Sequence, residues 1–261
     1  MTDGRLSRRA LLAAGAGSLG VLGFGGTAWA QSQQVSFDQT RQIDAQTGPE
    51  QPDVDLLVDW KEWYNGETRE TQETPTSRSD TSNALITLPD VKPGDSGKAA
   101  IGLSVAAAQG NPPPMELEMR IRELPTSRQE NGRNEPERKA GDTTDDVGEL
   151  QEYLDVFVWY DTGIQIEDAP IYGACDAAFN SGDTELADGS LADVSVTSAD
   201  GPWRTLDANP SNPADPSRCL RPNEALCLSF EWAVSGDENV NVVQSDSVSF
   251  NIEFRARQCP R

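Results

Sequence analysis

The chain has 261 residues, with 43 acidic and 21 basic side chains, four cysteines and no histidine. Without histidine, triads with an imidazole base and zinc sites of the HExxH type are excluded. The net charge of −22 makes nucleic acid and anionic membranes poor partners, because phosphate binding needs excess lysine and arginine. Only four of the basic residues are lysines. An acid-rich, lysine-poor composition suits strong brine, where salt screens carboxylates within roughly 3 Å at 1 M, so we predict a halophilic protein.

Residues 1–30 have the order of regions found in an export signal. Arg8 and Arg9 precede an apolar run rich in glycine, alanine and leucine, and Ala28 and Ala30 stand where a signal peptidase requires small residues. The twin arginine favours export through the Tat translocase, and cleavage after Ala30 is favoured over a retained membrane anchor. We therefore expect a secreted protein, at the cell surface or in the extracellular space, that is free of the membrane after cleavage.

Two parts are expected in the mature chain. Residues 31–53 are polar and form an extended N-terminal segment, in which Val35 and Phe37 are the apolar positions that would anchor it to another surface. Residues 54–261 are expected to form a single domain.

Apolar residues alternate with polar or small ones along much of this domain. Six segments have this period of two, which is typical of half-buried strands: residues 54–60, 101–105, 115–121, 154–158, 226–232 and 248–254. Weaker strands are expected at 84–88, 194–196 and 240–243. A short helix is expected at 148–154, long solvated loops at 67–80 and 126–146, and an irregular region at 172–193. The pattern predicts an all-β fold, an antiparallel β-sandwich or jelly roll with long irregular loops.

The four cysteines lie in the last third of the chain, at Cys175, Cys219, Cys227 and Cys259. In an exported protein an even number of cysteines predicts disulfides, and the absence of CxxC pairs disfavours a metal site. Three connectivities are open. The connectivity with Cys219–Cys227 is disfavoured, because that bond would close only a local turn. Of the other two, we favour Cys175–Cys219 with Cys227–Cys259.

Acidic and aromatic clusters in the sequence are candidates for a calcium, catalytic or sugar-binding site. Asp142, Asp145, Asp146, Glu149 and Glu152 could belong to a calcium loop or a glycosidase carboxylate pair, but the ligand spacing of a calcium loop is absent, so a solvated acidic loop is predicted. The aromatic residues within 60–64 and 158–161 could stack on sugars, although alternating strand aromatics more often lie in the core. No catalytic residue, metal ligand or cofactor is predicted, and the chain is not expected to be an enzyme.

Several motifs resemble the TasA/camelysin family, and in particular its large haloarchaeal branch. They are, in chain order, Gly25-Gly26-Thr27-Ala28-Trp29-Ala30 followed by Phe37-Asp38, the turn Leu88-Pro89-Asp90-Val91-Lys92-Pro93-Gly94-Asp95, Gly148-Glu149-Leu150 before Trp159-Tyr160-Asp161, Cys219-Leu220-Arg221-Pro222-Asn223-Glu224 before Phe230-Glu231-Trp232, and Asn241 through Gln244-Ser245-Asp246-Ser247 to Gln258-Cys259. Their order along the chain carries the resemblance.

The resemblance implies a jelly-roll subunit of biofilm-matrix fibres or pili. Such a subunit would polymerise with other copies of itself by donating its N-terminal strand to a neighbour's open sheet. This chain departs from the family in its twin arginines and in the inserted residues 31–35. Camelysin itself is described as a metalloprotease, and a chain without histidine has no HExxH motif for that activity. A secreted peptidase and a monomeric cell-surface module that binds glycan or protein are the alternatives.

Overall fold

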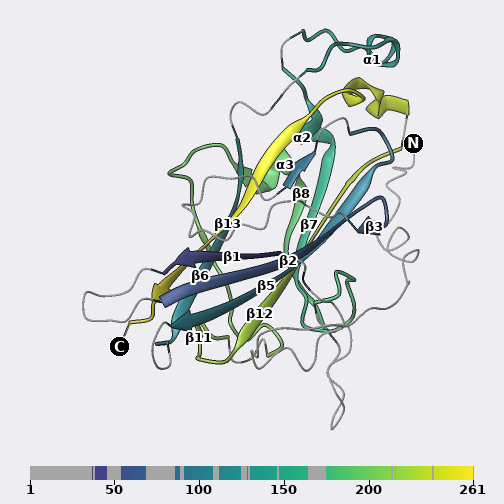
Figure 1. Ribbon diagram of the computed structural model, residues 1–261. Coiled ribbons are helices and arrows are strands. Elements are labelled where there is room, and N and C mark those ends of the chain that lie inside the picture. The colour runs from purple at the N-terminus through teal and green to yellow at the C-terminus, as the bar shows by residue number, and fades with distance from the viewer. Residues whose placement is uncertain are drawn as a thin grey trace.

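The computed structural model describes residues 37, 39–45, 54–68, 86–88, 91–107, 112–124, 128, 130–145, 147–163, 175–212, 214, 216–236 and 238–260. These residues form two mostly antiparallel β-sheets that share one hydrophobic core (Figure 1). The all-β sandwich predicted from the alternating segments is confirmed.

The first sheet, sheet A, has strand order β1-β2-β5-β12-β7-β8, and the short β3 also pairs with β2. Its strands are β1 (Gln39–Asp44), β2 (Val54–Tyr64), β3 (Glu67–Thr68), β5 (Ser96–Ala107), β7 (Leu154–Tyr160), β8 (Thr184–Ser190) and β12 (Ala225–Val234). Every pairing among these described strands is antiparallel.

The second sheet, sheet B, has the order β10-β6-β13-β4, and β9 and β11 also pair with β6. Its strands are β4 (Ile86–Leu88), β6 (Met115–Glu123), β9 (Ser195–Val196), β10 (Arg204–Thr205), β11 (Cys219–Leu220) and β13 (Val248–Gln258). Only β9 runs parallel to its neighbour among these described strands.

The core lies between the sheets and is built from the apolar residues of the alternating strands. Leu56 and Val58 of β2 and Ile101 and Leu103 of β5 are at most 1% exposed. Phe230 of β12 faces Phe250 of β13 with ring centroids 5.5 Å apart. Alternation therefore places every second side chain of these strands in the shared interior.

Three short α-helices and one 3-10 helix complete the described structure: α1 (Glu135–Ala140), α2 (Leu150–Tyr153), α3 (Leu191–Val194) and η2 (Glu238–Val243). The strand expected at 240–243 is wrong, because Val240 and Val243 reach the core with the three-residue spacing of η2. The region 126–146 is also not wholly a loop. Its helix α1 begins at a capping box made by Asn134 and Glu137. The helix expected at 148–154 is confirmed as α2.

Other sequence expectations can be compared directly. The strands expected at 84–88 and 194–196 are present as β4 and β9, over shorter ranges. The region 172–193 was expected to be irregular but contains the edge strand β8. Seen along the sandwich, α1 and η2 lie at one end, whereas β11 and the C-terminus lie at the other (Figure 1).

Candidate functional site: a buried carboxylate cluster

The disulfide pairing expected from the sequence is wrong. The bonds are Cys175–Cys227 and Cys219–Cys259, with Cα–Cα distances of 5.5 and 6.2 Å. Cys219 begins β11, which pairs with the start of β6, and Cys259 follows the β13 residue that pairs with the same end of β6. Sheet order therefore brings these two cysteines together across β6.

A buried carboxylate holds the segment that contains Cys175 close to Cys227. Asp161, at the end of β7, accepts hydrogen bonds from the backbone N–H of Cys175 (2.8 Å) and of Ala177 (2.9 Å) and from the hydroxyl of Ser229 (2.6 Å). Its own N–H donates to the carbonyl of Cys227. Burial raises the pKa of Asp161 to about 7. The side chain thus folds the segment after residue 174 onto the outer face of sheet A.

The same segment covers Trp159, one of the aromatic residues that are candidates for sugar stacking. Trp159 is fully buried and lies against Phe157 and Phe179, with ring centroids 5.0 and 5.8 Å away. Trp60 is 3% exposed and belongs to the core. Trp159 and Trp60 therefore have the packing role that the sequence pattern favoured.

The predicted export and assembly residues fall mostly outside the described residues. This holds for Arg8, Arg9, Ala28 and Ala30, and for Val35. Phe37 is described and half-buried. Part of the segment 31–53, which was expected to be extended, forms β1 and pairs with β2 of its own chain from Gln39 to Asp44.

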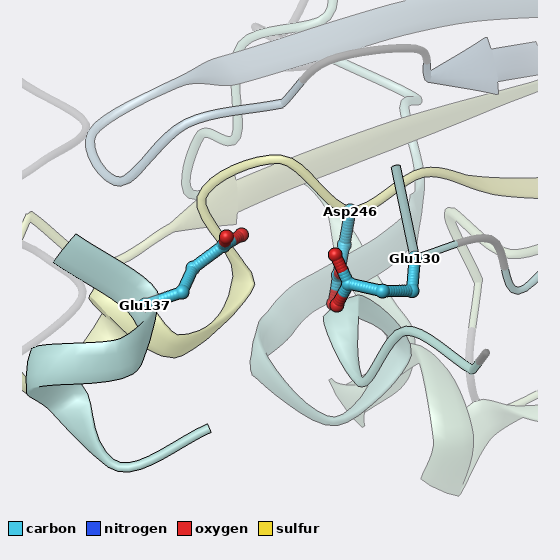
Figure 2. A group of neighbouring side chains, drawn as sticks. All are labelled: Glu130, Glu137 and Asp246. Atoms are coloured by element: carbon cyan, nitrogen blue, oxygen red, sulfur yellow. The ribbon is translucent and has the colours of Figure 1, made fainter. Parts of the chain in front are cut away.

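An acidic cluster lies at the end of the sandwich occupied by α1. Two overlapping groups of carboxylates share Glu130: Glu130 with Glu137 and Asp246, and Glu130 with Asp142 and Glu149. In each group one oxygen of every residue lies within 4.8 Å of the others. Figure 2 shows Glu130 and Asp246 with their carboxylates adjacent, and Glu137 reaching toward them from α1. We call these five residues the carboxylate cluster.

Four separate segments position the carboxylate cluster. Glu137 lies on α1, and Glu130 and Asp142 lie before and after this helix. Glu149 directly precedes α2 without a side-chain capping bond, and Asp246 lies between η2 and β13. Because α1 packs against η2, residues more than a hundred positions apart meet here.

Backbone and hydroxyl groups hold the cluster in place. Glu137, which is fully buried, accepts hydrogen bonds from the N–H (2.7 Å) and the hydroxyl (2.6 Å) of Ser245. Asp246 accepts one from the N–H of Glu149 (2.7 Å), and Asp142 accepts two from Thr144. One oxygen of Asp142 and one of Asp246 are thereby fixed. Glu137 is fixed at both oxygens, because the second accepts a hydrogen bond from the N–H of Asn134.

Other oxygens of the cluster accept no hydrogen bond from an N–H or hydroxyl donor. They are Oε2 of Glu130, Oδ2 of Asp142, Oε2 of Glu149 and Oδ1 of Asp246. Asp246 is fully buried and Asp142 is 6% exposed. Burial, together with the negative charges of Glu130 and Glu149, raises the pKa of Asp246 to about 7, and burial also raises the pKa of Glu130. The site is strongly electronegative.

Two residues of the carboxylate cluster are among the candidates in the acidic run of the sequence. Asp142 and Glu149 belong to the acidic run that was predicted to be a solvated loop, and that prediction is wrong for these two residues. Asp145 is exposed and forms an ion pair with Arg133, Glu152 is exposed, and Asp146 is outside the described residues. The missed residues are Glu130, Glu137 and Asp246. The capping-box spacing of Asn134 and Glu137 was a usable indication of α1.

A second group of buried carboxylates lies on the outer face of sheet B, among the alternating charged residues of β6. There each carboxylate has an arginine partner across the strands. Glu253 lies 2.6 Å from both Arg120 and Arg122, and Arg255 lies against Glu118. Arg257 bonds to Glu116 (3.0 Å) and Glu118 (2.8 Å). The arginine–glutamate ladder consists of Glu116, Glu118, Arg120, Arg122, Glu253, Arg255 and Arg257.

Trp203 covers the ladder. The guanidinium groups of Arg120 and Arg255 lie 4.2 and 4.3 Å from the centre of its ring. Glu118 and Glu253 are only 4% and 5% exposed, whereas Arg255 and Arg257 at the end of the ladder are 29% and 42% exposed.

No known protein family, characterised protein or solved structure matches the chain. Within the described part of the chain, no helix has the length and apolar character needed to cross a membrane.

Proposed function

We propose that the chain is a secreted structural protein that polymerises into extracellular or cell-surface fibres or pili by strand donation. The observation that supports this most directly is an incompletely paired strand in sheet B. β13 pairs with β6 over residues 250–258, but on its other side β4 pairs only with Val248–Phe250. Within the described residues no strand pairs with 251–257 on that side. Unpaired backbone groups along such an edge can accept a strand from another chain.

The N-terminal segment is the proposed donor. β1 contacts β13, and residues 31–38 precede β1 directly in the chain. β1 pairs with its own β2 and would anchor the segment to its own subunit. Val35 and Phe37 stand two apart, so both would face the acceptor's core.

Two disulfides suit an extracellular structural role. The disulfides tie β11 to the end of β13, and the segment over sheet A to β12, and each closes a loop of 40 residues or more. Loops of this length correspond to about 3–4 kcal/mol of stabilisation each on the chain-entropy estimate.

Deleting residues 31–38 from the mature chain tests the proposal. The expected product is a folded monomer that forms no filaments, whereas the complete mature chain forms them. Size-exclusion chromatography and negative-stain microscopy in molar salt give the readout. Filaments that persist without residues 31–38 contradict strand donation, and a complete mature chain that stays monomeric favours the binding module.

A matched pair of point variants separates strand insertion from a general charge effect. Phe37→Asp should reduce filament yield strongly, because it puts a charge where the donor strand faces the acceptor core. Ser36→Asp adds the same charge to the opposite face of that strand and should leave assembly nearly unchanged. Because Phe37 is half-buried in the monomer, the melting temperature of each monomer is measured first.

A further inference from the structure

We propose that the carboxylate cluster binds a calcium ion, with Glu130 as the central ligand. This binding does not require assembly and would occur in the monomer.

The spacing of the oxygens fits one ion. Calcium–oxygen bonds are about 2.4 Å long, so two oxygens on one ion lie at most about 4.8 Å apart. Both groups of three carboxylates meet this limit, and Glu130 belongs to both. An ion bound to Glu130 therefore has either Asp142 and Glu149 or Glu137 and Asp246 within reach.

Unpartnered oxygens point to a missing ligand. A buried carboxylate oxygen without a hydrogen bond or ion pair is costly, and such atoms are rare in native proteins. Here Asp142, which is 6% exposed, and Glu149 each have one. Glu130 and Asp246 form a side-chain hydrogen bond only with each other, which requires a proton between two carboxylates. The other oxygens of Glu130, Asp142 and Asp246 accept hydrogen bonds from the backbone, which orients these three carboxylates.

No protein cation neutralises the cluster within the described part of the chain. Two arginines close to Glu130 in the sequence are engaged elsewhere. Arg133 pairs with Asp145 and donates to the backbone carbonyl of Asp142, and Arg128 pairs with Glu123. Five carboxylates in so small a volume repel one another strongly, and a divalent cation removes that repulsion.

The donor set selects the class of ion. All side chains are carboxylates, the chain has no histidine, and its cysteines form disulfides, so the soft ligands preferred by zinc and copper are absent from the cluster. Calcium accepts six to eight oxygens in irregular geometry and binds directly to several carboxylates. Magnesium requires near-ideal octahedral geometry and keeps several waters. The clustering of anionic oxygens favours calcium.

A bound ion would tie α1 to the sandwich. Its ligands come from both sides of α1 and from the loop that leads into β13, so calcium would cross-link segments that otherwise meet through α1 and η2. We therefore expect calcium to raise stability and to protect residues 130–149 from proteolysis.

The test uses the mature chain in molar potassium chloride, freed of divalent ions with EGTA and titrated with calcium chloride by calorimetry and thermal melting. A single binding event is expected, and a hundredfold excess of calcium over its dissociation constant should raise the melting temperature by about 5–10 °C. Glu130→Gln should weaken binding at least tenfold. Glu152→Gln, which changes an exposed carboxylate near the cluster, should bind like the parent.

Absence of calorimetric heat together with an unchanged melting temperature overturns the proposal. So does a calcium response that Glu130→Gln retains in full. An equal response to magnesium overturns the assignment to calcium. Glu130→Gln is checked for folding by circular dichroism and by its calcium-free melting temperature, so a lost response cannot be mistaken for a lost fold.

Discussion

The carboxylate cluster and the arginine–glutamate ladder both contain buried acidic side chains, but they differ in how the negative charge is neutralised. In the ladder, Glu253, Arg255 and Arg257 stand directly opposite Arg120, Glu118 and Glu116 on the neighbouring strand. Sheet geometry itself pairs each charge with its opposite. In the cluster, residues from four segments bring carboxylates together with no arginine or lysine partner among the described residues. The ladder is neutralised from within, and the cluster depends on protons or an added cation.

The difference shows that an acidic composition is not a uniform surface property of this chain. Some of its negative charge is structural and internally compensated, whereas another part is concentrated where a small cation would bind. Removing one carboxylate should therefore have opposite consequences in the two places.

The largest effect is expected from Glu253→Gln in the ladder. Glu253 is 5% exposed and bonds to both Arg120 and Arg122, so its neutralisation leaves two partly buried guanidinium groups without their carboxylate. Breaking such a pair costs about 3 kcal/mol, or about 10 °C in melting temperature. The loss should be the same with and without calcium. A Glu253→Gln variant as stable as the parent would show that the ion pairs of the ladder do not stabilise the fold.

Gly148→Ala should disturb the cluster without changing its charge. A Cβ at Gly148 would lie 2.7 Å from Cγ of Asp246, so the carboxylate must move. We expect a loss of about 2 kcal/mol in stability and at least tenfold weaker calcium binding. Gly236→Ala is the matched control, since the nearest heavy atom to its Cβ would be 4.0 Å away. Equal effects of the two variants would show that Asp246 has no special role.

Glu130→Gln should stabilise the calcium-free protein by about 1 kcal/mol, the opposite sign to Glu253→Gln, because it removes a charge that repels its neighbours. Thermal melts in EGTA measure this. A destabilised calcium-free Glu130→Gln protein would mean that Glu130 is held by favourable contacts, as the ladder carboxylates are, and the contrast would fail.

The pH dependence of the calcium-free protein follows from the raised pKa of Asp246. A buried carboxyl with a pKa of about 7 keeps its proton in the folded state, whereas the unfolded chain loses it near the ordinary value of 3.8. The folded state then binds more protons between these values, so stability falls as pH rises from about 4 to about 7. Melting temperatures in EGTA should drop by a few degrees between pH 5 and pH 8. Asp161 contributes in the same direction, so the informative quantity is the flattening of this profile by saturating calcium.

Alternating strands could be predicted from the sequence because their pattern is local. Every second residue is apolar over 54–60 in β2, 115–121 in β6, 226–234 in β12 and 248–256 in β13, and that pattern alone assigns one face to the core. The edge strands β1 and β8 read QTRQID and TELADGS, which have no such alternation, so their assignment depends on neighbours that the sequence does not identify.

Pairings between distant segments could not be predicted in the same way. The cysteine pairs follow from which strands neighbour β6 and β7, a property of sheet order and not of spacing along the chain. Likewise, Asp142 and Glu149 stood out in an acidic run, but Asp246 joins them only because η2 packs on α1. A capping box at Asn134 and Glu137 was the one local indication that this region is ordered.

The smallest effect is expected from Asp145→Asn, which tests whether exposed acids near the cluster matter at all. The side chain of Asp145 is 73% exposed, and its partner Arg133 is itself 28% exposed. Exposed ion pairs contribute about 0–1 kcal/mol, and molar salt screens them further, so stability should change by less than about 0.5 kcal/mol. Calcium affinity should change by less than threefold, because the Asp145 carboxylate belongs to neither group of three. If Asp145→Asn instead weakens calcium binding as much as Glu130→Gln does, the general negative potential of this end attracts the ion and the five clustered oxygens do not bind it specifically.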